Sequence, residues 1–253
     1  MKTGEEQTRA AHPDGSSYSE EDIYSIIKET ILSGQVPAGT RLPEARLAPL
    51  FGVTRERLRK VLRRLGYENV LEIVPYIGTI VPKPTLENAR ELFGARRVLE
   101  SGICVTLCER INDHELRMLE DHMRIEQQLA ETGSRSDFIL ETSHFHRMLA
   151  QFIGNPLITQ QLDALLSKSN LFSAFLDPSN AAFCSCHEHR VILSALAKRD
   201  MYEAHHAMMS HLSLIETRLQ GPPQRAGRVD VHQIFLRALE RRSKAAEPKM
   251  KWS

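Results

Sequence analysis

Long apolar segments are absent from this 253-residue sequence. No apolar run approaches the roughly 20 residues that a helix needs to span a bilayer, so we expect no membrane association. Residues 1–17 are polar and lack the apolar core of a secretory signal. We therefore interpret them as a disordered leader and expect a cytoplasmic protein.

Cysteine, aromatic residues and net charge are also scarce. The four cysteines are expected to be reduced thiols, because no secretory signal accompanies them. Cys184 and Cys186 flank one serine, a spacing that places two thiols on different sides of a helix, so packing is favoured over metal binding. Cys104 and Cys108 are interpreted as core residues. A net charge of +1 gives no overall indication of a nucleic-acid partner.

The first third of the chain has a helix, helix, turn, helix, hairpin pattern. A helix over 18–33 begins with a capping box at Ser19 and Asp22. A short helix follows Pro43, and Gly52 and Thr54 then form a break and an N-cap. The remaining predicted elements are a helix over 55–65 and a hairpin of residues 70–74 and 79–81.

Everything after the stiff Pro82-Lys83-Pro84 segment has a helical pattern. The sequence therefore predicts a mainly α fold, with an N-terminal winged helix-turn-helix followed by an all-α helical bundle. The predicted divisions are a leader (1–17), a winged domain (18–82), a helical effector-binding and dimerisation domain (83–220) and a C-terminal tail (221–253) with a short helix at 231–241. Helices are expected at 85–110, 113–132, 136–153, 156–176, 181–199 and 201–220.

Basic residues concentrate in the helix over 55–65. Its apolar positions form one face, so its bases must point outward: Arg55, Arg57, Arg59, Lys60, Arg63 and Arg64, with Glu56 as the only acid. A helix with a basic outer face and a polar first turn is what the DNA major groove accepts. A merely solvated charged face is the alternative, which the preceding Gly-Val-Thr turn and the following hairpin disfavour.

The segment from Gly34 to Leu65 resembles the winged helix-turn-helix of the GntR family of bacterial regulators. Matching positions are Gly39, Leu42, Glu44, Leu47, Ala48, Gly52–Arg55, Arg59 and Leu65, with Pro75, Gly78 and Val81 in the wing. The resemblance implies binding to double-stranded operator DNA through Thr54, Arg55, Arg57, Arg59, Arg46 and Gly78. Ala45 and Ile77 depart from the family pattern at positions that are often basic, whereas Asn69 replaces a usual glycine and tolerates the left-handed conformation.

The second half resembles the FCD domain of the FadR-like subgroup. The matching segments are 91–100, 145–156, 188–193 and 210–212. The resemblance implies a divalent metal site, for Zn or Ni, formed by His146, His189 and His211. The family's aspartate ligand is replaced by Thr142, whose hydroxyl is a poor ligand. The alternative is a pocket of histidines that binds an anion without metal.

The resemblance also implies a pocket for a small carboxylate effector, lined by Arg96 and the three histidines. An ion pair of Arg96 with Glu100 on the surface is the alternative for that arginine. We therefore expect a homodimeric, ligand-responsive transcription regulator, most simply a repressor, and not an enzyme. A metal-dependent enzyme built on the histidine-rich bundle is the competing hypothesis.

Overall fold

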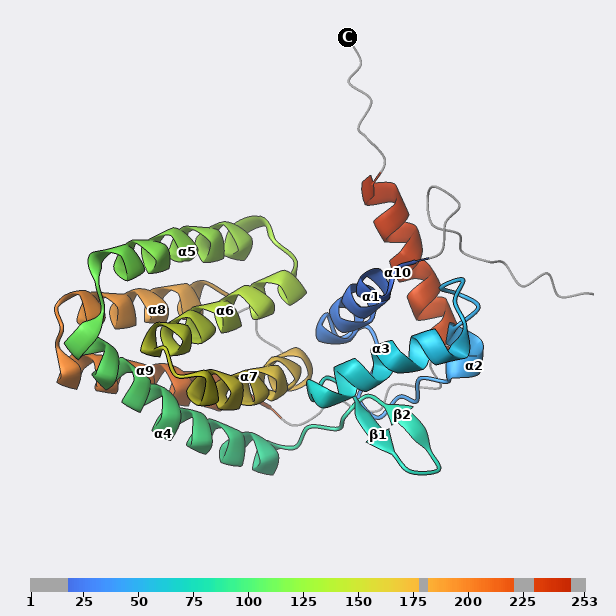
Figure 1. Ribbon diagram of the computed structural model, residues 1–253, viewed down its shortest axis with the longest axis horizontal. Helices are drawn as coiled ribbons and strands as arrows, with labels where there is room; N and C mark the ends of the chain where they lie inside the picture. Colours follow the sequence, from blue (N-terminus) through green and yellow to red (C-terminus); the bar gives the residue numbers. More distant parts are fainter. Residues whose placement is uncertain (1–17, 178–181, 221–229, 247–253) are drawn as a thin grey trace, which may run out of the picture. The chain divides into compact units, whose positions relative to one another are not determined.

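The computed structural model describes residues 18–177, 182–220 and 230–246. The leader expected at 1–17 lies outside them, as do residues 221–229 of the predicted tail. The chain divides into two compact units at Lys83, and helix α10 (Val231–Ala246) belongs with the first unit. The described residues are mainly helical, with one two-stranded sheet, which confirms the predicted fold class (Figure 1).

The first unit has the predicted order of elements. Ser19 caps the first helix through the expected capping box with Asp22. Thr54 caps the third, its hydroxyl accepting a hydrogen bond from the Arg57 amide at 3.2 Å. The elements are α1 (Glu20–Leu32), α2 (Glu44–Leu47), α3 (Arg55–Tyr67), β1 (Glu72–Val74) and β2 (Gly78–Ile80).

The first strand of the hairpin begins at Glu72, two residues later than the strand predicted over 70–74. The Val70 amide donates to the Leu65 carbonyl at 2.9 Å, which closes the end of α3 instead of pairing in the sheet. Asn69 adopts the left-handed conformation with φ of 58°, as its replacement of glycine predicted. Strand pairing therefore begins at Glu72, opposite Ile80.

Helix α10 completes the core of the first unit. Its amphipathic pattern was predicted for 231–241, but that pattern does not indicate which part of the molecule the helix covers. Phe235 and Leu239 are fully buried, and the Phe235 ring lies 6.1 Å from the ring of Phe51. The helix packs beside α1 within this unit (Figure 1). The winged fold therefore includes a segment from the far end of the chain.

The second unit is a helical bundle. Its helices are α4 (Leu86–Arg110), α5 (Asp113–Thr132), α6 (Arg135–Ile153), α7 (Pro156–Leu176), α8 (Ala182–Ala197) and α9 (Met201–Arg218). α4 packs along α9, α6 and α7, whereas α5 packs on α6 and α8. Within the described residues, no helix combines the length and apolar character that a membrane crossing requires.

The bundle interior contains many polar side chains. A packed core normally excludes ionisable groups unless they are paired, because removing a charge from water is costly. The buried polar and charged residues of this unit are Arg96, Glu100, Ser101, His122, Glu126, Ser136, His146, Ser169, Asn170, His189 and His211. Their concentration between the helices indicates a built site.

Candidate nucleic-acid interface and candidate metal centre

The outer face of α3 is basic, as the sequence predicted. Leu58, Val61, Leu62 and Leu65 are buried, which turns the arginines and Lys60 toward solvent. Arg55 and Arg63 are exposed and form no ion pair with another described residue. The first turn of this helix therefore presents backbone N–H groups beside the unpaired charge of Arg55, a combination suited to phosphate.

Two of the predicted DNA contacts are held by acidic partners. Arg59 forms a bidentate pair with Glu44, with Nε–Oε1 at 3.0 Å and Nη2–Oε2 at 2.6 Å. Arg46 forms an ion pair with Asp230 at 3.0 Å, at the start of α10. Both arginines stay largely exposed, so solvent screens these pairs and they remain easy to exchange for phosphate contacts.

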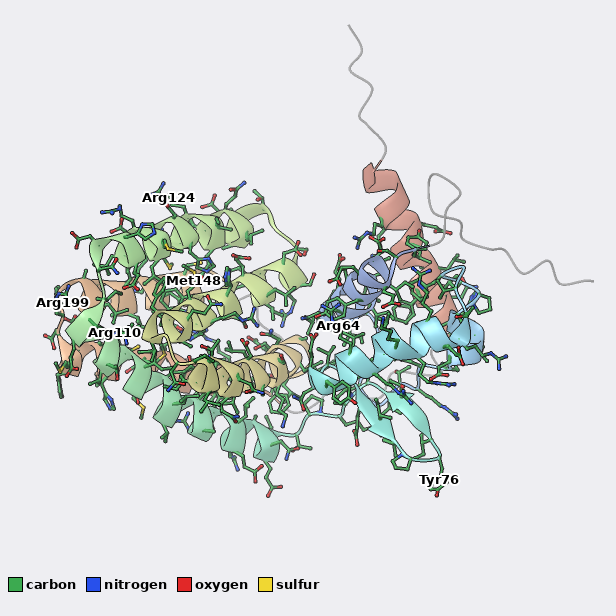
Figure 2. The ribbon with its side chains drawn as sticks, in the orientation of Figure 1. Arg64, Tyr76, Arg110, Arg124, Met148 and Arg199 are labelled. Atoms are coloured by element: carbon green, nitrogen blue, oxygen red, sulfur yellow. The ribbon has the colours of Figure 1, made fainter. Side chains whose placement is uncertain are left out.

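The wing adds two residues that the sequence did not single out. Tyr76 projects from the end of the hairpin, fully exposed, with a positive φ of 64° (Figure 2). A Cβ atom placed on Gly78 would lie 3.7 Å from the Nε and Nη2 atoms of Arg41. Arg41 therefore brings positive charge to the wing, where Ile77 replaces a base. The β-bridge of Arg41 to Ile80 is the link that sequence patterns could not reveal.

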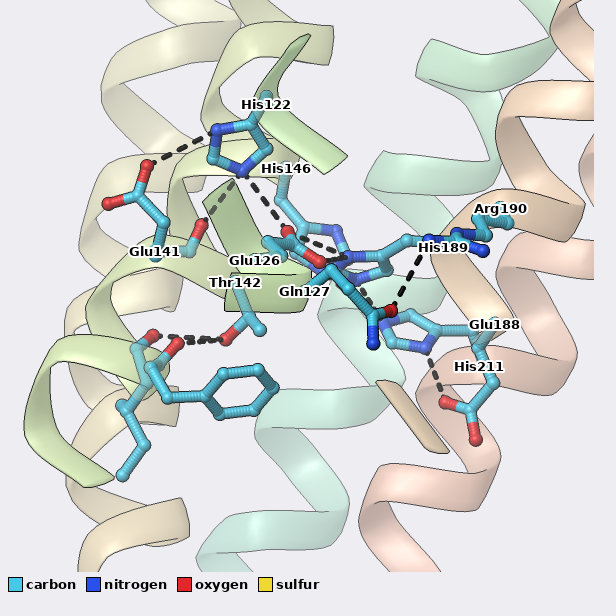
Figure 3. A network of polar contacts seen from close by, with 12 residues as sticks. His122, Glu126, Gln127, Glu141, Thr142, His146, Glu188, His189, Arg190 and His211 are labelled. Carbon is cyan, nitrogen blue, oxygen red and sulfur yellow. Dashed lines mark hydrogen bonds and ion pairs between the residues drawn. The ribbon is translucent and has the colours of Figure 1, made fainter. Parts of the chain in front are cut away.

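The three predicted histidines meet inside the helical unit. His146 of α6, His189 of α8 and His211 of α9 form what we call the inner cluster (Figure 3). The Nε2 atom of His211 lies 3.2 Å from the Nε2 atoms of both His189 and His146. Ligand atoms about 2.0–2.1 Å from a tetrahedral ion lie about 3.3 Å apart, so these separations fit a divalent cation such as zinc.

A separate carboxylate faces the outer nitrogen of each ring. His189 Nδ1 lies 2.9 Å from Glu126 Oε2, and His211 Nδ1 lies 2.7 Å from Glu188 Oε2. His146 Nδ1 lies 2.5 Å from Glu100 Oε2, an ion-pair contact without good hydrogen-bond alignment. Such carboxylates hold the ring proton on Nδ1 and leave the Nε2 lone pair for a metal.

Burial favours the neutral form of two of these rings. Burial lowers the pKa of His146 to about 4, against the opposing effect of Glu100. Burial likewise lowers the pKa of His211 well below its usual value. Burial raises the pKa of Glu100, but Arg96 and His146 outweigh it and bring the pKa to about 2. In the neutral forms of His146 and His211, two Nε2 atoms 3.2 Å apart thus face each other, an arrangement that a bound cation stabilises.

The inner cluster opens onto a cavity of about 310 Å³. Its lining includes Arg96, Arg135 and Arg218, together with Thr142. The Thr142 hydroxyl donates to the carbonyls of Phe138 and Ile139, at 3.1 Å each, which leaves its position poorly suited to ligation. Because position 142 is a threonine and not a carboxylate, the cavity side of the cluster is left for another ligand.

Arg96 is buried, which corrects the alternative of a surface ion pair. It does pair with Glu100, with Nε–Oε1 at 2.6 Å, but both side chains lie in the bundle interior. Its Nη1 also donates to Ser169 Oγ at 2.8 Å. Arg96 therefore joins the cavity to the carboxylate that holds His146.

The sequence identified the three rings and Arg96 but not the other groups around them. Glu126 comes from α5, whereas Arg135 is the first residue of α6 and Arg218 the last residue of α9, and no local motif marks any of the three. Glu188 adjoins His189 in sequence, which was the one available signal. Cys104, Cys108 and Cys186 are buried free thiols, and the side chain of Cys184 lies outside the described residues.

Comparison with known proteins agrees with both units. Residues 19–81 match the family model described as bacterial regulatory proteins, gntR family, and residues 91–214 match the FCD domain. The chain is 26% identical over 212 residues to the HTH-type transcriptional regulator YcbG of Bacillus subtilis, covering 78% of this chain and 88% of that protein.

Two further similarities concern proteins of Escherichia coli. The HTH-type transcriptional repressor RspR is 25% identical over 198 residues, which cover 77% of this chain and 86% of the repressor. The solved structure of McbR/YncC superposes with a TM-score of 0.63 at 20% identity, covering 77% of this chain and 93% of that one. At this level of identity, the similarity to McbR/YncC supports the fold alone.

Proposed function

Because the chain belongs to the gntR family of bacterial regulatory proteins and carries an FCD domain, we propose that it is a ligand-responsive repressor. Its winged unit binds double-stranded operator DNA in the cytoplasm. Its helical unit binds a small carboxylate effector together with a divalent metal ion. The observation that carries the effector half is the convergence of three Nε2 atoms beside an arginine-lined cavity.

The DNA contacts are assigned to the exposed face of α3 and to the wing. Arg55 and Arg57 lie in the first turn of α3 beside the Thr54 cap, where base edges and phosphates are both within reach. Arg59 and Arg46 join them by exchanging their acidic partners for phosphates. Gly78 lets the wing approach the minor groove, and Arg41 supplies its charge.

Binding to a partly palindromic operator requires two winged units. We therefore propose a homodimer, in which each copy engages one half-site. The effector biases the spacing of the two winged units by stabilising one arrangement of the helical units.

The metal is assigned to His146, His189 and His211. As a Lewis acid, it would hold an anionic oxygen of the effector at the position that Thr142 leaves open. Arg96 can assist, because its contacts with Glu100 and Ser169 use three of its five N–H groups. Arg135 and Arg218 line the same cavity and favour an anionic occupant.

DNA binding is tested by fluorescence anisotropy with an operator selected from a random DNA pool. Arg55→Ala should weaken binding by about 1–3 kcal/mol, because a specific base or phosphate contact is lost. The matched control is Arg90→Ala, an exposed arginine on α4. An affinity that is independent of both salt and DNA sequence would contradict the proposal.

The metal assignment is tested by elemental analysis of purified protein. His146→Ala should lose one equivalent of tightly bound metal, whereas His205→Ala, an exposed histidine on α9, should retain it. Small carboxylates should then raise the melting temperature of metal-loaded protein and not of stripped protein. Metal that persists in His146→Ala would show that the ligand set is wrong.

A further inference from the structure

A second group of metal-ligating side chains lies between α5 and α6, outside the effector cavity. We call His122, Glu141 and His144 the outer cluster. The Nδ1 atoms of His122 and His144 lie 3.2 Å and 3.3 Å from the same oxygen, Glu141 Oε1. Each residue offers one ligand atom, and the three atoms lie within 4.8 Å of one another. We propose that the outer cluster is a second divalent-cation site.

The hydrogen bonding of His122 supports a cation at this point. Its Nε2 atom lies 3.1 Å from Glu126 Oε1 and 3.1 Å from the Glu141 carbonyl oxygen (Figure 3). Both partners are acceptors, so Nε2 carries the ring proton. The Nδ1 lone pair of a neutral ring then points at the Glu141 carboxylate. Two lone pairs 3.2 Å apart repel each other, and a cation bound between them removes this repulsion.

The spacing fits a metal ion in that position. Ligand atoms about 2.0–2.1 Å from a tetrahedral ion are separated by about 3.3 Å, close to both contacts of Glu141 Oε1. Two imidazoles and one carboxylate are ligands that Zn²⁺, Ni²⁺ and Cu²⁺ accept, with water in the remaining positions. The Nε2–H group of His122 donates to Glu126. Metal-ligating histidines usually donate the N–H of their second ring nitrogen to a carboxylate in this way.

The outer cluster differs from the inner cluster in its access to solvent. The His144 side chain is 46% exposed and that of Glu141 is 27% exposed, and none of the three residues lines the effector cavity. An ion can therefore reach this site directly from solvent, whether or not the cavity is filled.

One carboxylate joins the two clusters. Glu126 Oε1 lies 3.1 Å from His122 Nε2 and 3.0 Å from His189 Nδ1, while Oε2 lies 2.9 Å from the same His189 nitrogen. An ion on His122 fixes the orientation of that ring and so of Glu126. Glu126 in turn orients a ligand of the inner cluster. The outer site is thus placed to alter metal affinity at the inner site.

Metal titration of the stripped full-length protein tests the proposal. Zn²⁺ binding, followed by calorimetry and by native mass spectrometry, should reach two equivalents per chain. His144→Ala should reduce this to one, because His144 is a partly exposed ligand whose loss leaves the bundle core intact. His205→Ala is the matched control and should keep two.

The variants also separate this proposal from the assignment of the inner cluster. His211→Ala should retain the outer equivalent, and Cu²⁺ bound to it should give electron paramagnetic resonance with coupling to two nitrogens. A different result would be a wild type that binds a single equivalent of metal, which His144→Ala abolishes. In that case the assignment of metal to the inner cluster fails, and the assignment to the outer cluster stands. An unchanged stoichiometry in both His144→Ala and Glu141→Gln would overturn the outer site, and His122 would then be a histidinium paired with two carboxylates.

Discussion

The winged unit and the helical unit place their charges in opposite ways. In the winged unit the arginines of α3 lie on the surface, over a core of aliphatic and aromatic side chains. In the helical unit, charged groups such as Arg96, Glu100 and Glu126 are buried between helices. The first arrangement suits a large polyanion that binds from outside, and the second suits a small ligand that must be enclosed.

The winged unit and the helical unit also differ in the interactions that stabilise them. The winged unit depends on apolar burial, to which α10 contributes. The helical unit encloses ionisable groups whose desolvation is offset only when every partner is present. Substitutions should therefore affect the two units independently, through different physical effects.

The largest expected effect is on the core of the winged unit. Phe235→Ala removes a fully buried ring beside Phe51 and should lower the free energy of unfolding of this unit by about 3–5 kcal/mol. Hydrogen exchange of the α1 amides measures this directly, with Gln233→Ala on the exposed side of α10 as the control. Equal loss of protection in α8 and α9 would contradict the independence of the units.

The next effect concerns the buried carboxylates. Glu126→Gln keeps the shape of the side chain but removes the charge behind His189, and should weaken metal binding by about 10–100-fold. Glu131→Gln, an exposed position on the same helix, is the matched control. Calorimetry provides the measurement, and an affinity unchanged by Glu126→Gln would remove Glu126 from the site. Operator affinity without effector should not change.

The smallest expected effect is on the surface of the winged unit. Asp230→Asn releases Arg46 from an exposed ion pair and removes a negative charge near the DNA-binding face. Exposed pairs contribute about 0–1 kcal/mol, so operator affinity should rise two- to threefold at most, by about 0.5 kcal/mol. The gain should disappear at high salt. Weaker binding would indicate that Asp230 orients Arg46 for DNA.

The two units also differed in how far the sequence predicted them. The α3 surface was predictable because helical periodicity alone decides which side chains of a thirteen-residue helix face outward. Local patterns also predicted the caps at Ser19 and Thr54, whereas the left-handed Asn69 was anticipated from the family resemblance.

Helical periodicity and local capping patterns could not predict the tertiary contacts. His146, His189 and His211 were identified only through resemblance, and the carboxylates behind them come partly from α4 and α5. Glu126 occupies an ordinary position of an amphipathic helix, and its burial depends on how α5 meets α8. For the same reason, the packing of α10 against Phe51 could not be predicted from its amphipathic pattern.

The central claim is that three imidazoles of the helical unit hold a metal ion beside the effector cavity. X-ray absorption spectroscopy of the His144→Ala variant, loaded with one equivalent of Zn²⁺, tests it most directly because this variant lacks the outer cluster. We expect three imidazole nitrogens at about 2.0–2.1 Å and one further oxygen or nitrogen. The oxygen shell should change when a carboxylate effector is added. A sulfur shell at about 2.3 Å, or fewer than three imidazoles, would contradict the assignment of the metal to the three histidines.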